Sequence, residues 1–294
     1  MVVAAVIDRA PVEVRALKTR AELDACVALQ RETWGETFSD VVPASILKVS
    51  QRIGGVAAGA FDDGGNLLGF VYGLTGVERG RIVHWSDMLA VRPEARNLGI
   101  GRRLKEHQRQ AVRELGGVVV YWTYDPLIAR NAHFNFNKLG IQVAEYVEDM
   151  YGTTDSVLHG GIPTDRLIVA WPTRDEEAHA RLLEARRTRE SADCRQAPVV
   201  TTDWIDSAAG ASILPHCVRV EIPADAEALL TTAPKPAAEW RAAVRRAIQW
   251  ALAAGYSVNG FYSDASEQRS YYLLTKQPRL VGSGSGTATT PRSS

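Results

Sequence analysis

The chain has 294 residues, 46% hydrophobic and 23% charged, which is an ordinary composition for a soluble globular protein of one or two domains. Lysine and arginine balance aspartate and glutamate, so the formal net charge is zero. Broad nucleic-acid binding needs a basic surface, and this composition argues against that class of function.

The cysteines and the apolar segments indicate the cellular compartment in which the protein is expected. Cys26, Cys194 and Cys217 are scattered and form no Cys-x-x-Cys pair, which favours a reducing environment and predicts neither a disulfide framework nor a zinc site. The apolar start is cut short at Asp8, and no apolar run reaches the ~18 residues of a membrane span. We therefore expect a cytoplasmic protein.

The first part of the chain predicts a mixed α/β sheet. Helices are expected after the capping box Thr19–Glu22, from Pro43, over 100–115 and over 130–139. Strands are expected at 12–17, 54–61, 67–73, 82–91, 118–123, 141–150 and 167–171. The glycine-rich run 54–61 is followed by turn residues and a strand, so it predicts a β-hairpin and not a dinucleotide loop.

A composition shift divides the chain. The charged stretch from Thr173 predicts a connecting helix, and the Gly/Ser/Thr-rich end predicts a disordered tail. The expected divisions are residues 1–172, a linker at 173–197, a smaller α/β region at 198–278 and a tail at 279–294. Within the smaller region, the helix–strand–strand order of 236–275 echoes that of 130–171, which a partial internal repeat or chance would explain equally.

An Arg-x-x-Gly-x-Gly loop at 96–101 stands between a strand and a helix. A helix start offers unpaired N–H groups and the positive end of the helix dipole, and both favour a phosphate. Glycine at 99 and 101 lets the backbone approach such a ligand closely.

This context resembles the GNAT superfamily of acyl-CoA-dependent N-acyltransferases over about residues 12–172. The residues that carry the resemblance are Val91, Pro93, Arg96, Gly99, Gly101, Leu104, Asn131, Ala132, Leu139 and Gly140. The segments 85–86, 122–127, 130–135 and 240–241 resemble a subgroup of predicted GNAT acetyltransferases with an extra C-terminal region. The fold class implied is a GNAT acyltransferase fold with a smaller C-terminal α/β region.

The resemblance also implies a cofactor site. The pantetheine arm of coenzyme A would lie between the strands at 85–91 and 118–123, with the pyrophosphate on the loop amides. The expected cofactor-binding residues are Met88, Leu89, Ala90, Val91, Arg96, Asn97, Leu98, Gly99, Ile100, Gly101, Arg102, Arg103 and Asn131. The arginines would add charge-assisted bonds or form a solvated helix face, and Asn131 would be a ligand contact or a helix cap.

Acyl transfer to an amine needs a base, an oxyanion donor and a proton for the leaving thiolate. Many GNAT enzymes place a tyrosine acid where this chain has Phe136, which has no proton to give. Tyr124 is the first candidate to replace it and His133 the second. For the base, Asp87 and His84 are three apart on one strand, so only one is expected to face the cleft, and Asp87 is preferred.

The expected function is N-acyl transfer from acetyl-CoA, or another acyl-CoA such as succinyl-CoA, to a small-molecule amine or amino acid. An arginine near the cleft would suit a carboxylated acyl group, but the sequence places none there. We expect no metal, no nucleic acid and no membrane partner, and a homodimer stays open. The alternative is a catalytically inactive acyl-CoA-binding sensor or assembly module, which the phenylalanine at 136 favours.

Overall fold

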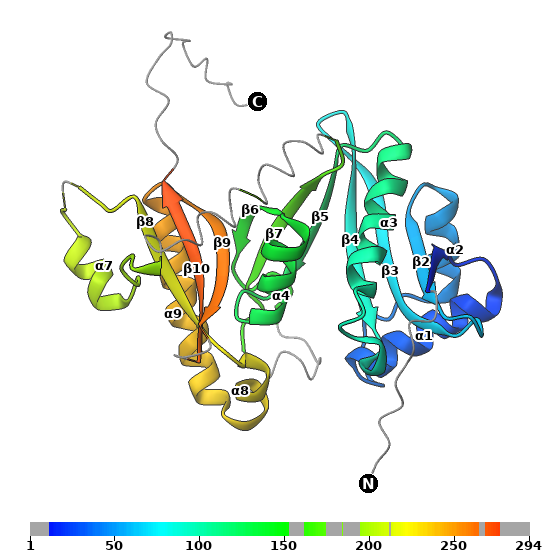
Figure 1. Cartoon of the computed structure of the whole chain (residues 1–294), viewed down its shortest axis with the longest axis horizontal. Helices are drawn as coiled ribbons and strands as arrows, with labels where there is room; N and C mark the ends of the chain where they lie inside the picture. Colours follow the sequence, from blue (N-terminus) through cyan, green and yellow to red (C-terminus); the bar gives the residue numbers. More distant parts are fainter. Residues whose placement is uncertain are drawn as a thin grey trace, which may run out of the picture.

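The computed structural model describes residues 12–152, 162–174, 184, 195–211, 213–264 and 268–276. These residues form two sheets side by side, each with helices packed against it (Figure 1). No helix in the described part of the chain is long and apolar enough to cross a membrane.

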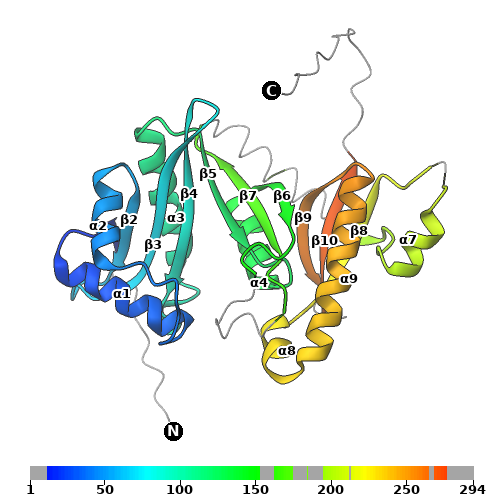
Figure 2. The same ribbon diagram turned by 180° about the vertical axis from the view of Figure 1, so that it is seen from behind.

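The larger sheet has seven strands in the order β1-β2-β3-β4-β5-β7-β6. Its strands are β1 (Glu13–Ala16), β2 (Val56–Phe61), β3 (Leu67–Glu78), β4 (Arg81–Val91), β5 (Val119–Tyr124), β6 (Gln142–Val147) and β7 (Arg166–Pro172). Helices α1 (Arg20–Trp34) and α2 (Ala44–Arg52) lie on one face and α3 (Ile100–Glu114) on the other (Figure 2). The mixed α/β sheet expected from the sequence is confirmed.

Local sequence explains where these elements begin. The predicted capping box starts α1, because Thr19 accepts from the N–H of Glu22 and the Glu22 carboxylate accepts from the N–H of Thr19. Helix α4 (Ala129–His133) runs into a π-helical turn, η2 (Phe134–Leu139), which ends at Gly140 with a φ of 66°. Only a left-handed residue fits that position, which explains the glycine.

Strands β4 and β5 are parallel neighbours that separate. They pair at only two positions, the last joining Trp85 to Tyr121. β4 continues to Val91 without further pairing on that side, so its edge toward β5 is left open. The expected gap between the two strands is therefore present.

A β-bulge interrupts β4 at Asp87. Ser86 pairs with Gly73 and Met88 with Tyr72, so Asp87 is the extra residue. A bulge shifts the alternation of side chains between the two faces. Ser86 accordingly contacts α3, whereas Met88 packs in the core cluster of α1 and α2.

The smaller sheet has three antiparallel strands in the order β8-β10-β9. Its elements are α7 (Thr202–Ala208), β8 (Cys217–Pro223), α8 (Ala226–Thr232), α9 (Pro234–Ala253), β9 (Tyr256–Asp264) and β10 (Arg269–Lys276). The last strand lies in the middle, as β7 does between β5 and β6. This shared topology favours a partial repeat of the strand–helix–hairpin unit over chance.

The two regions pack through buried polar contacts. Arg241 of α9 forms a bidentate ion pair with Asp125, which follows β5, and the Tyr272 hydroxyl donates to the carbonyl of Pro126 at 2.8 Å. Phe136 stacks edge-on against Tyr272. The C-terminal region is thus anchored where β5 ends, beside the gap.

The predictions missed α7, α8 and the extension of β3 to Glu78. The expected connecting helix falls largely, and the expected tail entirely, outside the described residues. The proposed domain boundaries stay predictions.

Candidate active site

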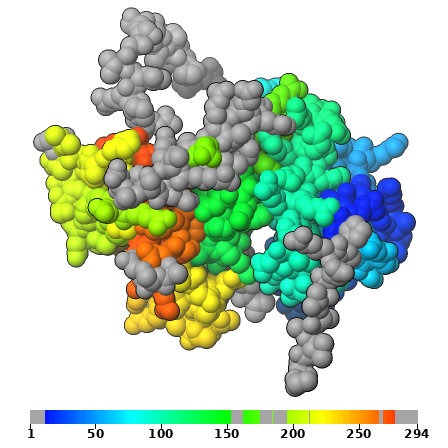
Figure 3. Space-filling model, viewed as in Figure 1, coloured from blue at the N-terminus to red at the C-terminus, as the bar shows by residue number. Residues whose placement is uncertain are grey.

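The gap between β4 and β5 opens into a cleft of about 1980 Å³. Its lining comes from the end of α1, β4, the loop at 96–101, the first turns of α3, the segment 122–135 and the C-terminal region. Figure 3 shows an opening between the α3 side and the α4 side of the molecule. The C-terminal region therefore forms one wall of the cleft and does not merely pack beside it.

The loop presents free amides at the phosphate end of this cleft. Asn97 and Gly99 have φ angles of 65° and 75°, and α3 begins directly after them. Within the described residues, no N–H from Asn97 to Arg102 donates to the chain, and the next one, of Arg103, reaches Gly99 O. A helix start with such unpaired amides is suited to a pyrophosphate.

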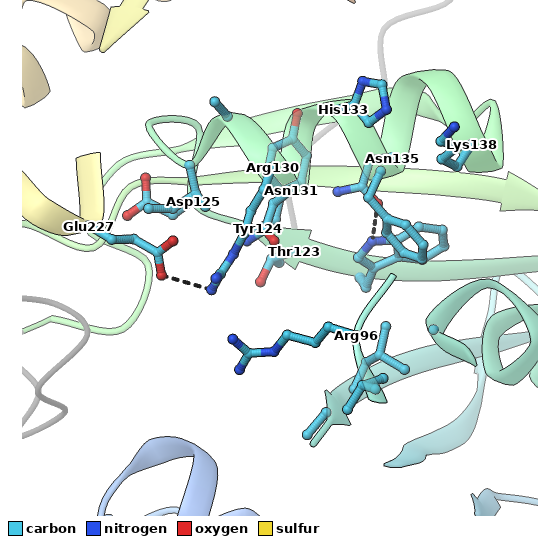
Figure 4. Close-up of a pocket in the computed structure, with 18 of the residues that line it drawn as sticks. Arg96, Thr123, Tyr124, Asp125, Arg130, Asn131, His133, Asn135, Lys138 and Glu227 are labelled. Carbon is cyan, nitrogen blue, oxygen red and sulfur yellow. Dashed lines mark hydrogen bonds and ion pairs between the residues drawn. The ribbon is translucent and has the colours of Figure 1, made fainter. Parts of the chain in front are cut away.

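Charged side chains near the loop differ in direction. Arg96 points from the loop into the cleft (Figure 4). Arg102 also lines it but pairs with Glu106 at 2.7 Å on the exposed face of α3. Arg103 instead donates to Val12 O and lies outside the lining, so its predicted phosphate contact is not supported.

The other predicted cofactor residues are mostly in place. Met88, Leu89, Ala90, Val91 and Asn131 line the cleft, whereas the Leu98 side chain does not. Helix α4 has Ile128 at its N-cap, so Asn131 lies inside the helix and does not cap it.

A lysine that the sequence analysis missed lies in the cleft lining. Lys105 of α3 is only 3% exposed, donates to Ser86 Oγ at 2.7 Å and stands 3.9 Å from the centroid of the Trp122 ring. Burial lowers its pKa well below the ordinary value. Its position in the amphipathic pattern of α3, next to Leu104, gave no sign that it points inward.

Comparison with models of known protein families assigns the N-terminal part of the chain to a family. Residues 23–140 match the model of the acetyltransferase (GNAT) family. The N-terminal part of the chain is a GNAT-family domain. The match ends within the first sheet, so the C-terminal region is additional to it.

Solved structures similar to the GNAT domain have low identity. They include an aminoglycoside 6'-N-acetyltransferase with coenzyme A (17% identity, TM-score 0.43, 56% of this chain and 98% of that chain). The ribosomal-protein-S18-alanine N-acetyltransferase of Escherichia coli has 21% identity and a TM-score of 0.42, over 56% and 96%. An N-acetyltransferase of Staphylococcus aureus Mu50 has 16% identity and a TM-score of 0.45, over 56% and 99%. The search of curated proteins returned no match.

In the GNAT domain, the bulge places Asp87 at the cleft. Its side chain is exposed to the cleft, beside Asp40 from the α1–α2 loop. The protein around the mouth of the cleft still excludes part of the water from this carboxyl, and this desolvation, followed by the Asp40 charge, raises the pKa of Asp87. His84 is fully buried between Thr75 and Gln108, outside the lining, and burial lowers its pKa to about 4. Of the two base candidates, only Asp87 faces the cleft.

The acid candidates also reach this cleft, from its other side. Tyr124 is buried at the end of β5, where its side chain lies close to that of Tyr272. His133 lies on the exposed side of α4, where Asn137 contacts its ring at 3.2 Å. Phe136 is fully buried in the core, so the position of the usual tyrosine is occupied by a packing residue.

Proposed function

We propose that the chain is an acyl-CoA-dependent N-acyltransferase that transfers an acyl group, acetyl in the first instance, to the amine of a small molecule or amino acid. The observation that carries this proposal is the open edge of β4, which leads from the apex of the gap to the free loop amides. That arrangement offers hydrogen bonds to an extended pantetheine arm and an anion site at its phosphate end.

The chemistry follows a direct transfer. The amine nitrogen attacks the thioester carbonyl, a C–N bond forms and the C–S bond breaks. Asp87, directly or through one water, accepts the proton of the amine. A backbone N–H of β4 between Met88 and Ala90 stabilises the oxyanion, and Tyr124 is the first candidate to protonate the thiolate.

The acceptor side of the cleft supports an amine substrate. Trp34 and Phe38 stack at 5.7 Å between ring centroids, and Asp40 and Asp87 lie on the same side of the cleft. Aromatic faces and carboxylates both attract a cationic amine before it is deprotonated. The small molecule or amino acid would therefore bind between α1 and β4.

A glycine substitution tests the cofactor assignment. A Cβ at Gly101 would lie 3.7 Å from the Phe134 ring and 3.9 Å from Leu89, inside the gap. Gly101→Val is expected to abolish the thermal stabilisation that coenzyme A gives, while the apoprotein stays folded. Gly76→Val is the control, because its Cβ meets nothing within 4 Å. Undiminished stabilisation of the Gly101 variant would contradict the phosphate site.

The absent tyrosine favours a second function, an acyl-CoA-binding module without catalysis. Phe136 is 0% exposed and cannot transfer a proton. Release of free thiol from acyl-CoA, measured with a panel of amines, separates the two functions. Turnover supports the enzyme, whereas tight coenzyme A binding without turnover across the panel supports the module.

If acyl transfer is observed, the Tyr124→Phe variant tests whether Tyr124 protonates the leaving thiolate. We expect the maximal rate to fall about tenfold to a hundredfold, since general acid catalysis typically contributes at least that much. The dissociation constant for coenzyme A should change little, because the ring is retained. Tyr121→Phe, on the same strand outside the lining, is the control. An unchanged rate would transfer the role to His133 or to solvent.

A further inference from the structure

Lys105 is a buried lysine without an acidic partner among the described residues. Its Nζ has two contacts in the described residues, the Ser86 hydroxyl at 2.7 Å and the face of Trp122. No carboxylate of the described residues pairs with it, and burial alone accounts for its lowered pKa. An ammonium removed from water is costly unless it is paired, so this site is incomplete as it stands.

The position of Lys105 along the gap indicates what would complete it. Pairing of β4 with β5 ends at Trp85 and Tyr121, and Ser86 and Trp122 are the next residues along the two strands. Lys105 therefore lies at the apex of the gap, while the loop amides lie at the opposite end. A pantetheine arm that runs along β4 from the loop brings the thioester and its acyl group toward the apex.

The other cations of the cleft lie elsewhere. Arg96 and Arg102 belong to the phosphate end, and Arg130 pairs with Glu227 at 2.7 Å across the wall formed by α8 (Figure 4). Arg166 lies 3.5 Å from Asp125. Lys138 is exposed, and Arg269 pairs with Glu221 at 3.2 Å. Among the basic side chains of the described lining, Lys105 is thus the one placed to meet the end of an acyl chain.

We propose that Lys105 binds a carboxylate at the end of the acyl chain, so that the preferred donor is a dicarboxylic acyl-CoA. The proposal rests on the proposed acyl-CoA site. A carboxylate would form a charge-assisted bond with the buried Nζ and supply the missing counter-charge. The methyl of an acetyl group would leave the lysine without a partner.

The test compares two donors with the same number of acyl carbons. Succinyl-CoA ends in a carboxylate and butyryl-CoA in a methyl, and calorimetry on the full chain at pH 7 gives both affinities. We expect succinyl-CoA to bind about tenfold to a hundredfold more tightly, as a buried charge-assisted bond would give. Lys105→Met should remove this preference and leave the affinity for free coenzyme A unchanged.

Lys138→Met is the matched control, because Lys138 also lines the cleft but is exposed. The preference should persist in that variant. Equal affinity of the unmodified chain for both donors would overturn the inference and leave the proposed function standing. Binding of neither donor, nor of coenzyme A, would overturn both. The donor comparison on the unmodified chain stays decisive even if the Lys105 variant misfolds.

Discussion

Replacing Arg241 by methionine is expected to lower the free energy of unfolding by about 3 kcal/mol, because removing one partner of a buried ion pair leaves an uncompensated charge. The Arg241 side chain is 3% exposed, and its two terminal nitrogens bond both oxygens of Asp125, at 2.8 and 2.5 Å. We expect the lower end of the known range, since Arg166 remains 3.5 Å from the same carboxylate.

Urea unfolding followed by tryptophan fluorescence measures this change. Arg246→Met is the control on the same helix, because Arg246 is exposed and bonds only the Thr202 hydroxyl among the described residues. Its effect should stay within about 0.5 kcal/mol, as for most surface substitutions. An equal, small effect of both variants would show that the Asp125–Arg241 pair contributes little to joining the two regions.

The same ion pair bears on the cleft. Asp125 also accepts the N–H of Leu127 at 2.8 Å, so it shapes the turn that follows Tyr124. An aspartate that accepts the N–H two residues later, as Asp125 does, is typical of a turn. Its pairing with an arginine more than a hundred residues away follows from the packing of α9 and could not be seen in a local pattern.

The phosphate end of the site was predictable because its signals are local. The strand, the glycines and the helix start lie within about twenty residues of each other, and backbone geometry alone places the free amides at the helix start. The strand–helix order that follows is equally local. From these local features, the fold class and the phosphate-binding role of the loop could both be predicted.

The apex of the gap was not predictable for two physical reasons. Lys105 lies next to Leu104 on an amphipathic helix, where a lysine normally belongs to the solvated face. Its burial depends on the separation of β4 from β5, which is a feature of the tertiary structure. The bulge at Asp87 also changes the face of the sheet on which the Ser86 side chain lies. No residue pattern along β4 predicts a bulge at this position.

The wall of the cleft that the C-terminal region forms could not be predicted from the sequence either. Glu227 of α8 pairs with Arg130 of α4, and the hairpin of β9 and β10 contributes Asp264 and Arg269 to the lining. These residues come from a region whose helix α8 was not predicted. The acceptor space is therefore bounded by both regions, and its shape depends on how they pack.

Asp87→Asn is expected to lower the maximal rate of acyl transfer by about a hundredfold to ten-thousandfold, the usual contribution of a positioned general base. The amide keeps the size of the side chain but cannot take a proton. Asp63→Asn is the control, an exposed aspartate in the β2–β3 turn. Steady-state rates at saturating acyl-CoA give the comparison, and equal rates for the two variants would exclude Asp87 as the base.

The pH dependence of the rate distinguishes a role of Asp87 as a base from a purely structural role. Burial and the Asp40 charge raise the pKa of Asp87, and a base works only when deprotonated. The rate should therefore fall as the pH drops through a value above the ordinary ~3.9 of aspartate. Asp40→Asn removes the neighbouring negative charge, so the acid limb of the profile should move to lower pH. A limb that stays in place would mean that Asp40 does not act on the titrating group.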